Sequence, residues 1–229
     1  MLSNINSRSL ESGMLSGLRK ATLKNKNNKD AFFFNVRLLL RFNGDFKDNS
    51  LLNKTVSVIG DPVITSSITK YGGGAARFIN GSGYLSVPSN NNYVLGTADF
   101  TIESWLYFDL VGTQTRGIVE TSTGTTTNGF VFRSDNGTLR FLNNTTILVG
   151  GSIVVYRWYH VAVSRKNGVF RLFLDGKLVN SNTTVINFTN ASDIHVGKGF
   201  RGNMDDFRFT TGVCRYTEDF KPPKQLQIK

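Results

Sequence analysis

The stretch that decides the fold is DFTIESWLYFDL, residues 99–110. Its apolar and polar side chains alternate, and side chains alternate between the two faces of a β-strand. The large apolar residues on one face are Phe100, Ile102, Leu106 and Phe108. Glu103, Trp105 and Tyr107 fall on the opposite face. The pattern predicts a strand that buries its first face in a core and turns the second outward.

The same alternation of apolar and polar residues recurs through the rest of the chain. The segment RWYHVAVSRKNGVFRLFLDGKLVN, residues 157–180, predicts three strands joined by Asn-Gly and Asp-Gly, which suit tight hairpin turns. TTVINF, residues 183–188, is read as a further strand. In all, about thirteen short strands separated by turn residues are predicted, with no helix of about ten residues, which is typical of a sandwich or barrel. We therefore expect one all-β domain of two packed antiparallel sheets over residues 31–225, followed by a tail at 226–229.

Residues 1–30 differ from everything after them. They hold six basic residues against two acidic ones and show no strand alternation. Their apolar residues have a rough helical spacing that two glycines interrupt. We interpret the segment as an extended, basic N-terminal arm that gains order by packing on a partner; a disordered tail is the alternative. The arm residues predicted to bind that partner are Arg8, Leu10, Met14, Leu15, Leu18, Arg19, Lys20 and Lys24.

Composition restricts the other function classes. The net charge is +11 over 229 residues, which favours anionic partners, but the basic residues after position 30 are dispersed and form no recognised nucleic-acid module. Nucleic-acid binding is therefore not expected. The single cysteine excludes an internal disulfide framework. The absence of a long apolar run predicts no membrane contact, and the N-terminus lacks the apolar core of a secretory signal.

A second informative stretch is FRGNMDDFRFTTGVCRYTEDFKPP, residues 200–223. Met204, Phe207 and Phe209 cannot share one face of a regular strand, so a β-bulge is predicted near the aspartate pair. Within that bulge, one aspartate is expected to accept backbone N–H groups or to pair with Arg208 or Arg201. A metal-binding role for the pair is the alternative.

The ordered set of segments resembles a known family. The matching pieces are LLLRFNGDFKDNS (38–50), KYGGGAARFINGSGYLSVP (70–88), DFTIESWLYFD (99–109), RWYHVAVSRKNGVFRLFLDGKLV (157–179) and HVGKGFRGNMDDFRFTTGVCRYTEDFKPP (195–223). Together they resemble the laminin-G-like members of the concanavalin A-like jelly-roll superfamily, and more narrowly the LamG-like domains of bacteriophage structural proteins. The resemblance implies that the last piece is the final strand and that it pairs near the first one.

Catalysis is not expected. The jelly-roll glucanases that the chain resembles carry a Glu-X-Asp-X-X-Glu pattern, and this sequence, with four glutamates, has none. Glu103 is predicted to form a salt bridge or a cross-strand pair instead. His160 and His195 are read as hydrogen-bonded sheet residues, because no nucleophile-elbow glycine pattern surrounds a serine.

Binding of carbohydrate and of calcium remains open. Lectins of the resembled fold stack an aromatic ring on a sugar and use Asn and Asp beside it, so Asn91, Asn92 and Tyr93 are candidate glycan-binding residues. No cofactor is expected other than a Ca²⁺ ion, which would need several converging oxygen ligands. The candidate calcium ligands are Asp45, Asp48, Asp205 and Asp206.

The resemblance therefore implies a non-enzymatic structural protein of a bacteriophage virion. Capsid decoration or cement, or a tail or fibre component, are the roles expected, as an oligomer within the assembly that contacts other virion proteins through the arm. The alternative is a lectin-like adhesion module for glycans of the host surface.

Overall fold

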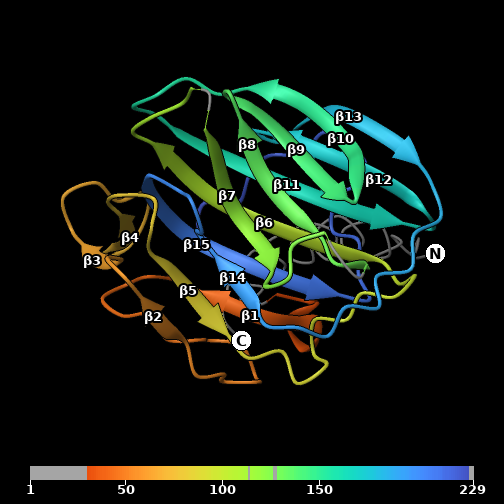
Figure 1. Cartoon of the computed structure of the whole chain (residues 1–229), viewed down its shortest axis with the longest axis horizontal. Helices are drawn as coiled ribbons and strands as arrows, with labels where there is room; N and C mark the ends of the chain where they lie inside the picture. Colours follow the sequence, from red (N-terminus) through yellow and green to blue (C-terminus); the bar gives the residue numbers. More distant parts are fainter. Residues whose placement is uncertain (1–29, 113, 126–127, 227–229) are drawn as a thin grey trace, which may run out of the picture.

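The chain folds into a β-sandwich of two antiparallel sheets (Figure 1). The computed structural model describes residues 30–112, 114–125 and 128–226. It contains fifteen strands, preceded by a 3-10 helix η1 (Phe33–Asn35). These findings confirm the all-β sandwich that the alternation predicted and the jelly roll that the resemblance implied. No helix in the described ranges has the length and hydropathy needed to cross a membrane.

The first sheet contains, in spatial order, β13 (Lys177–Thr183), β12 (Val169–Leu174), β11 (Trp158–Lys166), β6 (Phe100–Phe108), β15 (Gly202–Thr211), β4 (Ala75–Phe78) and β3 (Val63–Thr65), with β1 (Val36–Leu40) also paired to β15. The second contains β10 (Thr145–Ser152), β9 (Thr138–Asn143), β8 (Val131–Asp135), β7 (Thr115–Thr121), β14 (Ile194–Val196), β5 (Tyr84–Val87) and β2 (Ser57–Ile59). The pairing of β1 with β15 agrees with the resemblance, which placed the first and last strands together.

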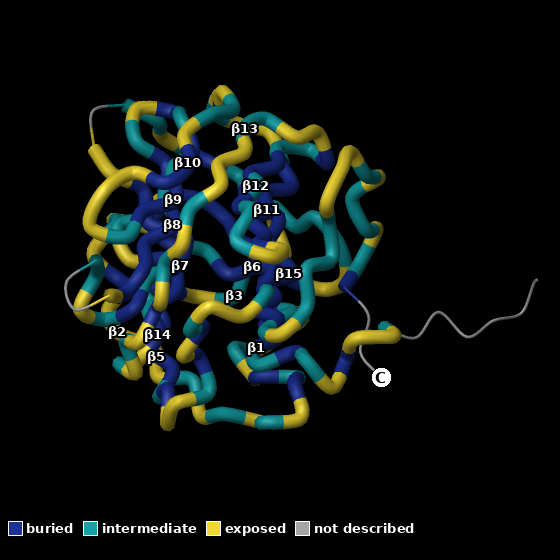
Figure 2. Tube along the Cα trace, turned by 90° about the vertical axis from the view of Figure 1, so that its right-hand side faces the viewer, coloured by how far each residue is buried: buried dark blue, intermediate teal, exposed yellow. Residues whose placement is uncertain are grey.

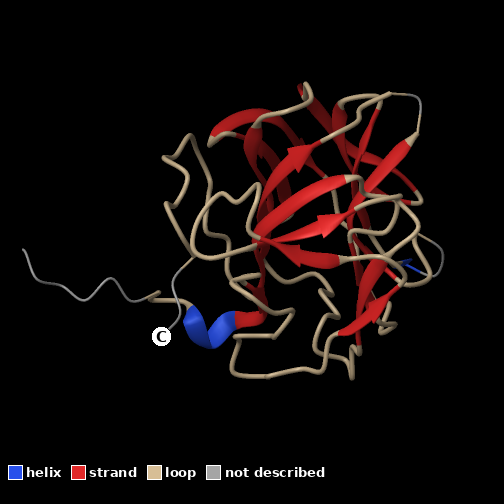
Figure 3. Cartoon of the chain, turned by 90° about the vertical axis from the view of Figure 1, so that its left-hand side faces the viewer, coloured by secondary structure: helices blue, strands red, loops and turns tan. Residues whose placement is uncertain are grey.

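The core lies between the sheets and is rich in phenylalanine. Phe100 and Ile102 of β6 are fully buried there, as the alternation predicted, and the Phe141 ring from β9 packs against Phe100 across the sandwich. Each such side chain contributes about 1.5–3 kcal/mol when fully buried. Figure 2 shows the result along the chain: the central strands are buried, and the exposed stretches lie in loops and at the edges. Figure 3 shows that strands make up the body and that helix is confined to short turns.

The bulge predicted in β15 is present. Its register against β6 shifts between Asp205 and Arg208, and Asp206 takes a left-handed φ of 47°. The shift lets Met204 before the bulge and Phe207 after it reach the same core. Gly202 at the start of the strand has a φ of 143° and lies against the Tyr107 carbonyl, where a Cβ would clash.

A segment after β15 covers the outer face of the first sheet. The rings of Tyr216 and Phe220 stack at 3.5 Å between centroids and contact Phe173 of β12. Leu226 is 1% exposed and packs in a small cluster with the apolar residues of η1 and β1. The packed domain thus includes residues up to Leu226, which the sequence analysis had assigned to the tail.

The strand predicted for residues 183–188 is wrong. β13 ends at Thr183, Val185 is 91% exposed, and Phe188 forms only an isolated bridge with Gly96. The chain leaves one sheet for the other here, so its backbone has no ladder beside it. The Ile186 carbonyl is bonded instead by a side chain, the Arg165 guanidinium, at 3.0 Å.

Candidate functional site

The Asp205–Asp206 pair fastens two segments to β15. Asp205 Oδ2 accepts hydrogen bonds from the backbone N–H groups of Lys70 and Tyr71, at 3.0 and 2.9 Å. Asp206 Oδ2 accepts one from Leu226 at 2.9 Å. The expectation that one aspartate accepts backbone N–H groups is confirmed. The expected arginine partners are wrong, because the ion pair formed is between Asp206 and Arg41, at 3.6 Å.

Burial changes the acidity of this pair. Desolvation raises the pKa of Asp205 to about 7, with the neighbouring Asp206 charge adding to the rise. Desolvation also raises the pKa of Asp206 to about 6. One oxygen of each carboxyl group, Oδ1, is buried without a hydrogen-bond partner among the described residues.

The four candidate calcium ligands do not converge. Asp48 Oδ1 accepts from the backbone N–H groups of Leu39 in β1 and of Ser50, and Asp48 Oδ2 accepts from that of Lys54; Asp45 accepts from Lys47 N. In the ranges that the structure describes, no group of three His, Cys, Asp or Glu residues is arranged to hold a metal ion. The prediction fails because each of these aspartates accepts backbone N–H groups, near in sequence or distant, and the four carboxylates do not gather around one point.

Glu103 lies at the centre of a buried ionic network. Its Oε1 accepts two hydrogen bonds from Arg208, at 2.9 and 2.7 Å, and its Oε2 lies 2.8 Å from the Tyr216 hydroxyl and 3.2 Å from His160 Nε2. Burial alone would raise the pKa of Glu103, but the Arg208 charge and the His160 hydrogen bond hold that pKa well below its usual range. The salt bridge predicted for Glu103 is confirmed. A carboxylate that stays ionised and sealed from solvent is unsuited to general acid catalysis.

Asp30, the first residue that the structure describes, also belongs to this network. Asp30 accepts a two-pronged pair of hydrogen bonds from Arg215, at 2.9 and 2.8 Å, and a third from Arg208 at 2.9 Å. Bidentate pairs of this kind are among the strongest that side chains make. Asp30 therefore holds the entry to the sandwich against β15 and the segment after it.

Of the glycan-binding residues predicted from the sequence, Tyr93 is not available to a sugar. The Tyr93 ring is 1% exposed, packs edge-on against Phe209 and donates its hydroxyl to the Arg37 carbonyl. It therefore has no face to offer a sugar, and its role as a stacking ring is wrong. Asn91 is exposed and Asn92 half-buried, with the Asn92 amide bonded to the Ser89 carbonyl. Tyr93 ends the polar run SNNNY, residues 89–93, and its ring belongs to the core.

An exposed aromatic surface lies elsewhere, on the outer face of the first sheet. Tyr107 of β6 and Trp158 of β11 are directly opposite one another, with ring centroids 5.7 Å apart. Tyr156, just before β11, adds a ring 6.5 Å from Tyr107 and is 68% exposed. We call these three residues the aromatic platform. Tyr107 and Trp158 are half-buried, so each keeps part of its ring open to solvent.

The backbone under the platform is unusual. Tyr156 has a φ of 65°, a conformation that costs a residue with a Cβ about 1–2 kcal/mol. Its N–H is held by the Phe108 carbonyl at 2.9 Å. Strain of this kind recurs at functional positions.

Charged pairs flank the aromatic platform on two sides. Arg77 of β4 forms an ion pair with Asp109, two residues beyond Tyr107, and also donates to Asn203 at 2.9 Å. On the other side, Arg157 pairs with Asp175 at 2.7 Å. Both pairs keep exposed atoms. Rings bordered by a few placed donors and acceptors are the composition of a surface that binds a polar ligand with apolar faces.

The sequence analysis placed Tyr107 on the outward face but assigned it no role, and it did not single out Tyr156 or Trp158. The signal was the run YRWY at 156–159, three aromatic residues in four at the start of a strand. Pairing that strand with residues 100–108 would have brought Trp158 beside Tyr107.

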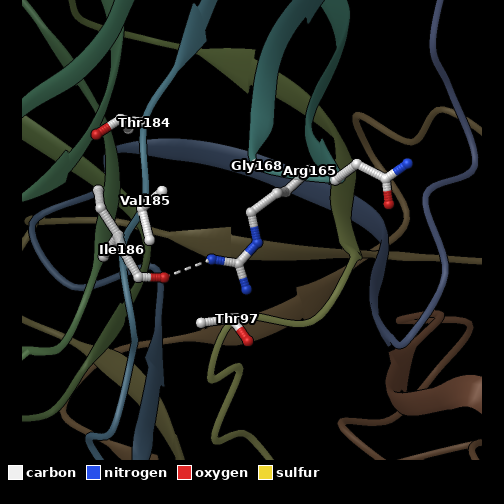
Figure 4. Close-up of a pocket in the computed structure, with 7 residues that line it drawn as sticks. Thr97, Arg165, Gly168, Thr184, Val185 and Ile186 are labelled. Carbon is white, nitrogen blue, oxygen red and sulfur yellow. Dashed lines mark hydrogen bonds between the residues drawn. The ribbon is translucent and has the colours of Figure 1, made fainter.

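A separate hollow surrounds Arg165 at the opposite end of β11 (Figure 4). The Arg165 side chain is 1% exposed, and its guanidinium donates to the carbonyls of Ile186, Gly96 and Ala98. Burial lowers the pKa of Arg165 to about 10, which leaves it charged at neutral pH. Because its donors bind backbone carbonyls, Arg165 ties two loops together and presents little to a ligand.

Comparison with known proteins agrees with this architecture. The family model described as the concanavalin A-like lectin/glucanases superfamily (Laminin_G_3) matches residues 80–215, more than half of the chain. No curated protein sequence matches the chain.

Several solved structures share the fold. Domain 4 of AbnA, an extracellular GH43 arabinanase of Geobacillus stearothermophilus solved with arabinotriose, is 18% identical with a TM-score of 0.62, over 78% of this chain and 93% of that domain. The binding domain of Paraclostridial Mosquitocidal Protein 1 is 14% identical with a TM-score of 0.65, over 80% of this chain and 50% of that one. The botulinum neurotoxin serotype D binding domain is 14% identical with a TM-score of 0.64, over 79% and 48%. The chain thus spans about half the length of the two toxin domains. These likenesses establish the fold, and with the family match they show that the chain belongs to the concanavalin A-like lectin/glucanase superfamily.

Proposed function

We propose that this chain is a non-enzymatic carbohydrate-binding module and that the aromatic platform is its sugar-binding surface. The observation that carries the proposal is the alignment of Tyr107, Tyr156 and Trp158 on one exposed face, with ring centroids 5.7 and 6.5 Å apart. Large rings left in water forgo the stabilisation that their burial would bring. A pyranose or furanose ring presents C–H groups to such faces and hydroxyls to the ion pairs beside them.

Two further observations support the proposal. The fold is shared with a domain whose structure was solved with arabinotriose, so a related scaffold holds an oligosaccharide. The Tyr156 φ of 65° also positions a ring where a relaxed backbone would not, which favours a role that requires the ring there.

The absence of catalysis is part of the proposal. Its support is the state of Glu103, whose two oxygens bind Arg208, Tyr216 and His160 and whose side chain is fully buried. Glycoside hydrolysis needs two carboxyl groups facing a sugar, one of which donates a proton. The Glu103 carboxylate is ionised and therefore has no proton to donate. It also lies beneath a covering segment and therefore does not face a sugar.

A second candidate function concerns the setting in which the module works. We propose that it is a structural protein of a bacteriophage virion, in a capsid decoration or a tail or fibre, attached through residues 1–29. The specific support is the clamp at Asp30, whose contacts with Arg208 and Arg215 hold the residue that follows this segment firmly against the sandwich. The predicted arm residues, Arg8 to Lys24, lie outside the described residues. The sequence resemblance favoured this role over sugar binding, whereas the aromatic platform supports sugar binding, which we therefore propose as the first function.

Sugar binding is tested with the full chain on a panel of oligosaccharides, including arabinotriose, followed by calorimetry on those retained. Trp158→Ala and Tyr156→Ala should each weaken binding at least about tenfold, the loss expected of an aromatic anchor. Phe34→Ala is the matched control, because Phe34 is an aromatic side chain with 75% exposure outside the aromatic platform. If Phe34→Ala weakens binding as much as Trp158→Ala, or if no sugar of the panel binds, the proposal is wrong.

The virion role needs its own test. A chain beginning at Asp30 should fold and keep its sugar binding but fail to join virions, because it lacks the anchoring arm. Incorporation equal to that of the full chain would place the anchor on the sandwich instead.

A further inference from the structure

A pocket of about 350 Å³ opens at the end of β6, the strand that carries Tyr107 of the aromatic platform. Its wall is formed by the connection after β6, by Arg116 of β7 and by Arg201 just before β15. The residues that line it are Leu110, Val111, Gly112, Gln114, Arg116 and Arg201. Its volume lies within the range of about 300–1,000 Å³ found for small-molecule sites.

The pocket contains two arginines and no counter-charge. Arg116 is 5% exposed, and its guanidinium donates to the Leu110 carbonyl at 3.4 Å and to Gln114 Oε1 at 3.2 Å. Neither Arg116 nor Arg201 forms an ion pair with any carboxylate of the described residues. Burial, and then the charge of the nearby Arg201, lowers the pKa of Arg116.

Other buried arginines of this chain are compensated. Arg208 has Glu103 and Asp30, and Arg165 has a set of backbone carbonyls. The nearest acidic residue along the chain, Asp109, is already paired with Arg77. A buried guanidinium beside a second one, with a neutral amide and one carbonyl as partners, lacks the anion that buried charges ordinarily have.

We propose that this pocket binds the anionic group of an acidic carbohydrate, a uronate carboxylate or a sulfate ester, while the aromatic platform stacks the sugar rings. Both groups present several oxygens to the fork of donors that a guanidinium carries. The inference rests on the proposed sugar-binding function and names the class of sugar.

The placement of the two features supports a single ligand. Gly202 pairs with Phe108, the residue after Tyr107 of the aromatic platform, so Arg201 lies one position further along. The Asp109 N–H donates to the Arg201 carbonyl at 3.2 Å, which fixes that register. Two residues of strand span about 7 Å, comparable with one or two sugar units.

The experiment compares matched charged and neutral ligands by calorimetry at low salt, using the full chain. Oligogalacturonate is paired with its methyl ester, and a dextran sulfate oligomer with unmodified dextran; inorganic sulfate is titrated alone. The acidic member of at least one pair should bind at least about tenfold more tightly than its neutral form, as a charge-assisted hydrogen bond predicts. The carboxylate and sulfate arms separate the two sources of the anion.

Variants then assign the effect to the pocket. Arg201→Gln, an exposed position, should remove the preference for the acidic ligand and leave the neutral form unaffected. Arg116→Gln should do the same if it folds, which circular dichroism checks. Lys166→Gln is the charge-matched control, because Lys166 is an exposed cation at the opposite end of β11 from Trp158.

The outcomes separate this inference from the proposed function. If acidic and neutral forms bind equally and Trp158→Ala abolishes both, sugar binding stands and the anion pocket is wrong. If Lys166→Gln reduces the preference as much as Arg201→Gln, the effect comes from net charge and the pocket is again wrong. If inorganic sulfate binds through Arg201 while no sugar binds, an acidic carbohydrate is not the ligand.

Discussion

Strands β6 and β11 carry two contrasting regions on the same outward face. At one level Glu103 and His160 are fully buried beneath Tyr216, with their charges paired inside the chain. Four residues further along β6, Tyr107 lies beside Trp158 with rings partly open to solvent. In the first region ionic groups are sealed, and in the second apolar groups are exposed. The side chains of the first region are thus occupied by contacts within the chain, whereas the rings of the second keep surface that a ligand could contact.

The largest effect is expected from removing a charge in the buried region. Glu103→Ala leaves Arg208 buried without its main partner, so we expect a loss of about 3–5 kcal/mol in the free energy of unfolding, measured in urea. Glu120→Ala is the control, since Glu120 is partly exposed and pairs with Lys198 at 3.0 Å, for which about 0–1 kcal/mol is expected. Equal losses in the two variants would contradict the special role of Glu103.

A gentler change removes one donor from the sealed carboxylate. Tyr216→Phe deletes the hydroxyl that lies 2.8 Å from Glu103 Oε2 while keeping the ring stacked on Phe220. We expect unfolding to become easier by about 1–3 kcal/mol, because a buried acceptor loses a partner. The same deletion in the open region, Tyr156→Phe, should change stability by less than about 0.5 kcal/mol. A neutral effect of Tyr216→Phe would show that the hydroxyl is not needed to satisfy Glu103.

The buried aspartate pair of β15 should make the stability of the fold depend on pH. The pKa of Asp205 is raised from 3.8 to about 7, so between these values the folded chain binds more protons than the unfolded one, and stability falls as pH rises. Asp205→Asn removes this group and keeps its acceptor for Lys70 and Tyr71, so the decline should flatten. Asp206→Asn should flatten it less, since that pKa is raised only to about 6. Urea unfolding at about pH 4.5 and about pH 7.5 measures the slope; an unchanged slope in Asp205→Asn would refute the assignment.

The smallest effect on stability is expected at Tyr156, the most exposed ring of the aromatic platform. Tyr156→Gly relieves the left-handed strain but adds flexibility to the unfolded chain, and the two terms should offset to within about 0.5 kcal/mol. Sugar binding should nevertheless fall, because a ring of the aromatic platform is lost. Unfolding in urea and calorimetry on the same sample give both values. A destabilisation above about 1.5 kcal/mol would mean that Tyr156 is a structural cover rather than an open ring.

The sequence predicted the sandwich well because its signals are local. Alternation along residues 99–110 identified both faces of β6, and the mismatch between Met204 and Phe207 identified the bulge. The strand proposed for residues 183–188 failed because alternation reports which side chains are apolar and not whether a partner strand lies alongside. The alternation likewise does not predict the pairing register of strands that are not joined by a hairpin.

The candidate site was harder to predict because it depends on which side chains are covered by segments that are distant in the sequence. Tyr93 follows the polar run SNNN and Tyr156 follows the apolar run IVV, yet Tyr93 is 1% exposed and Tyr156 is 68% exposed. The difference comes from distant segments that pack over one and leave the other free. The pocket arginines illustrate the same point, since Arg116 and Arg201 are 85 positions apart in the sequence. Arg116 belongs to β7, which pairs with β14, the strand that ends five residues before Arg201.

The clamp at Asp30 has a mechanical consequence. A pull on the chain from its N-terminal side would reach the two-pronged contact with Arg215, and the contact with Arg208, before it reached η1 or β1. Arg208 belongs to β15, which at this position pairs with β6 on one side and with β1 on the other. The load would therefore enter the middle of the sheet and be shared by its neighbours, instead of peeling a strand from an edge. A module tethered at this point would resist tension while its sugar-binding face stayed intact.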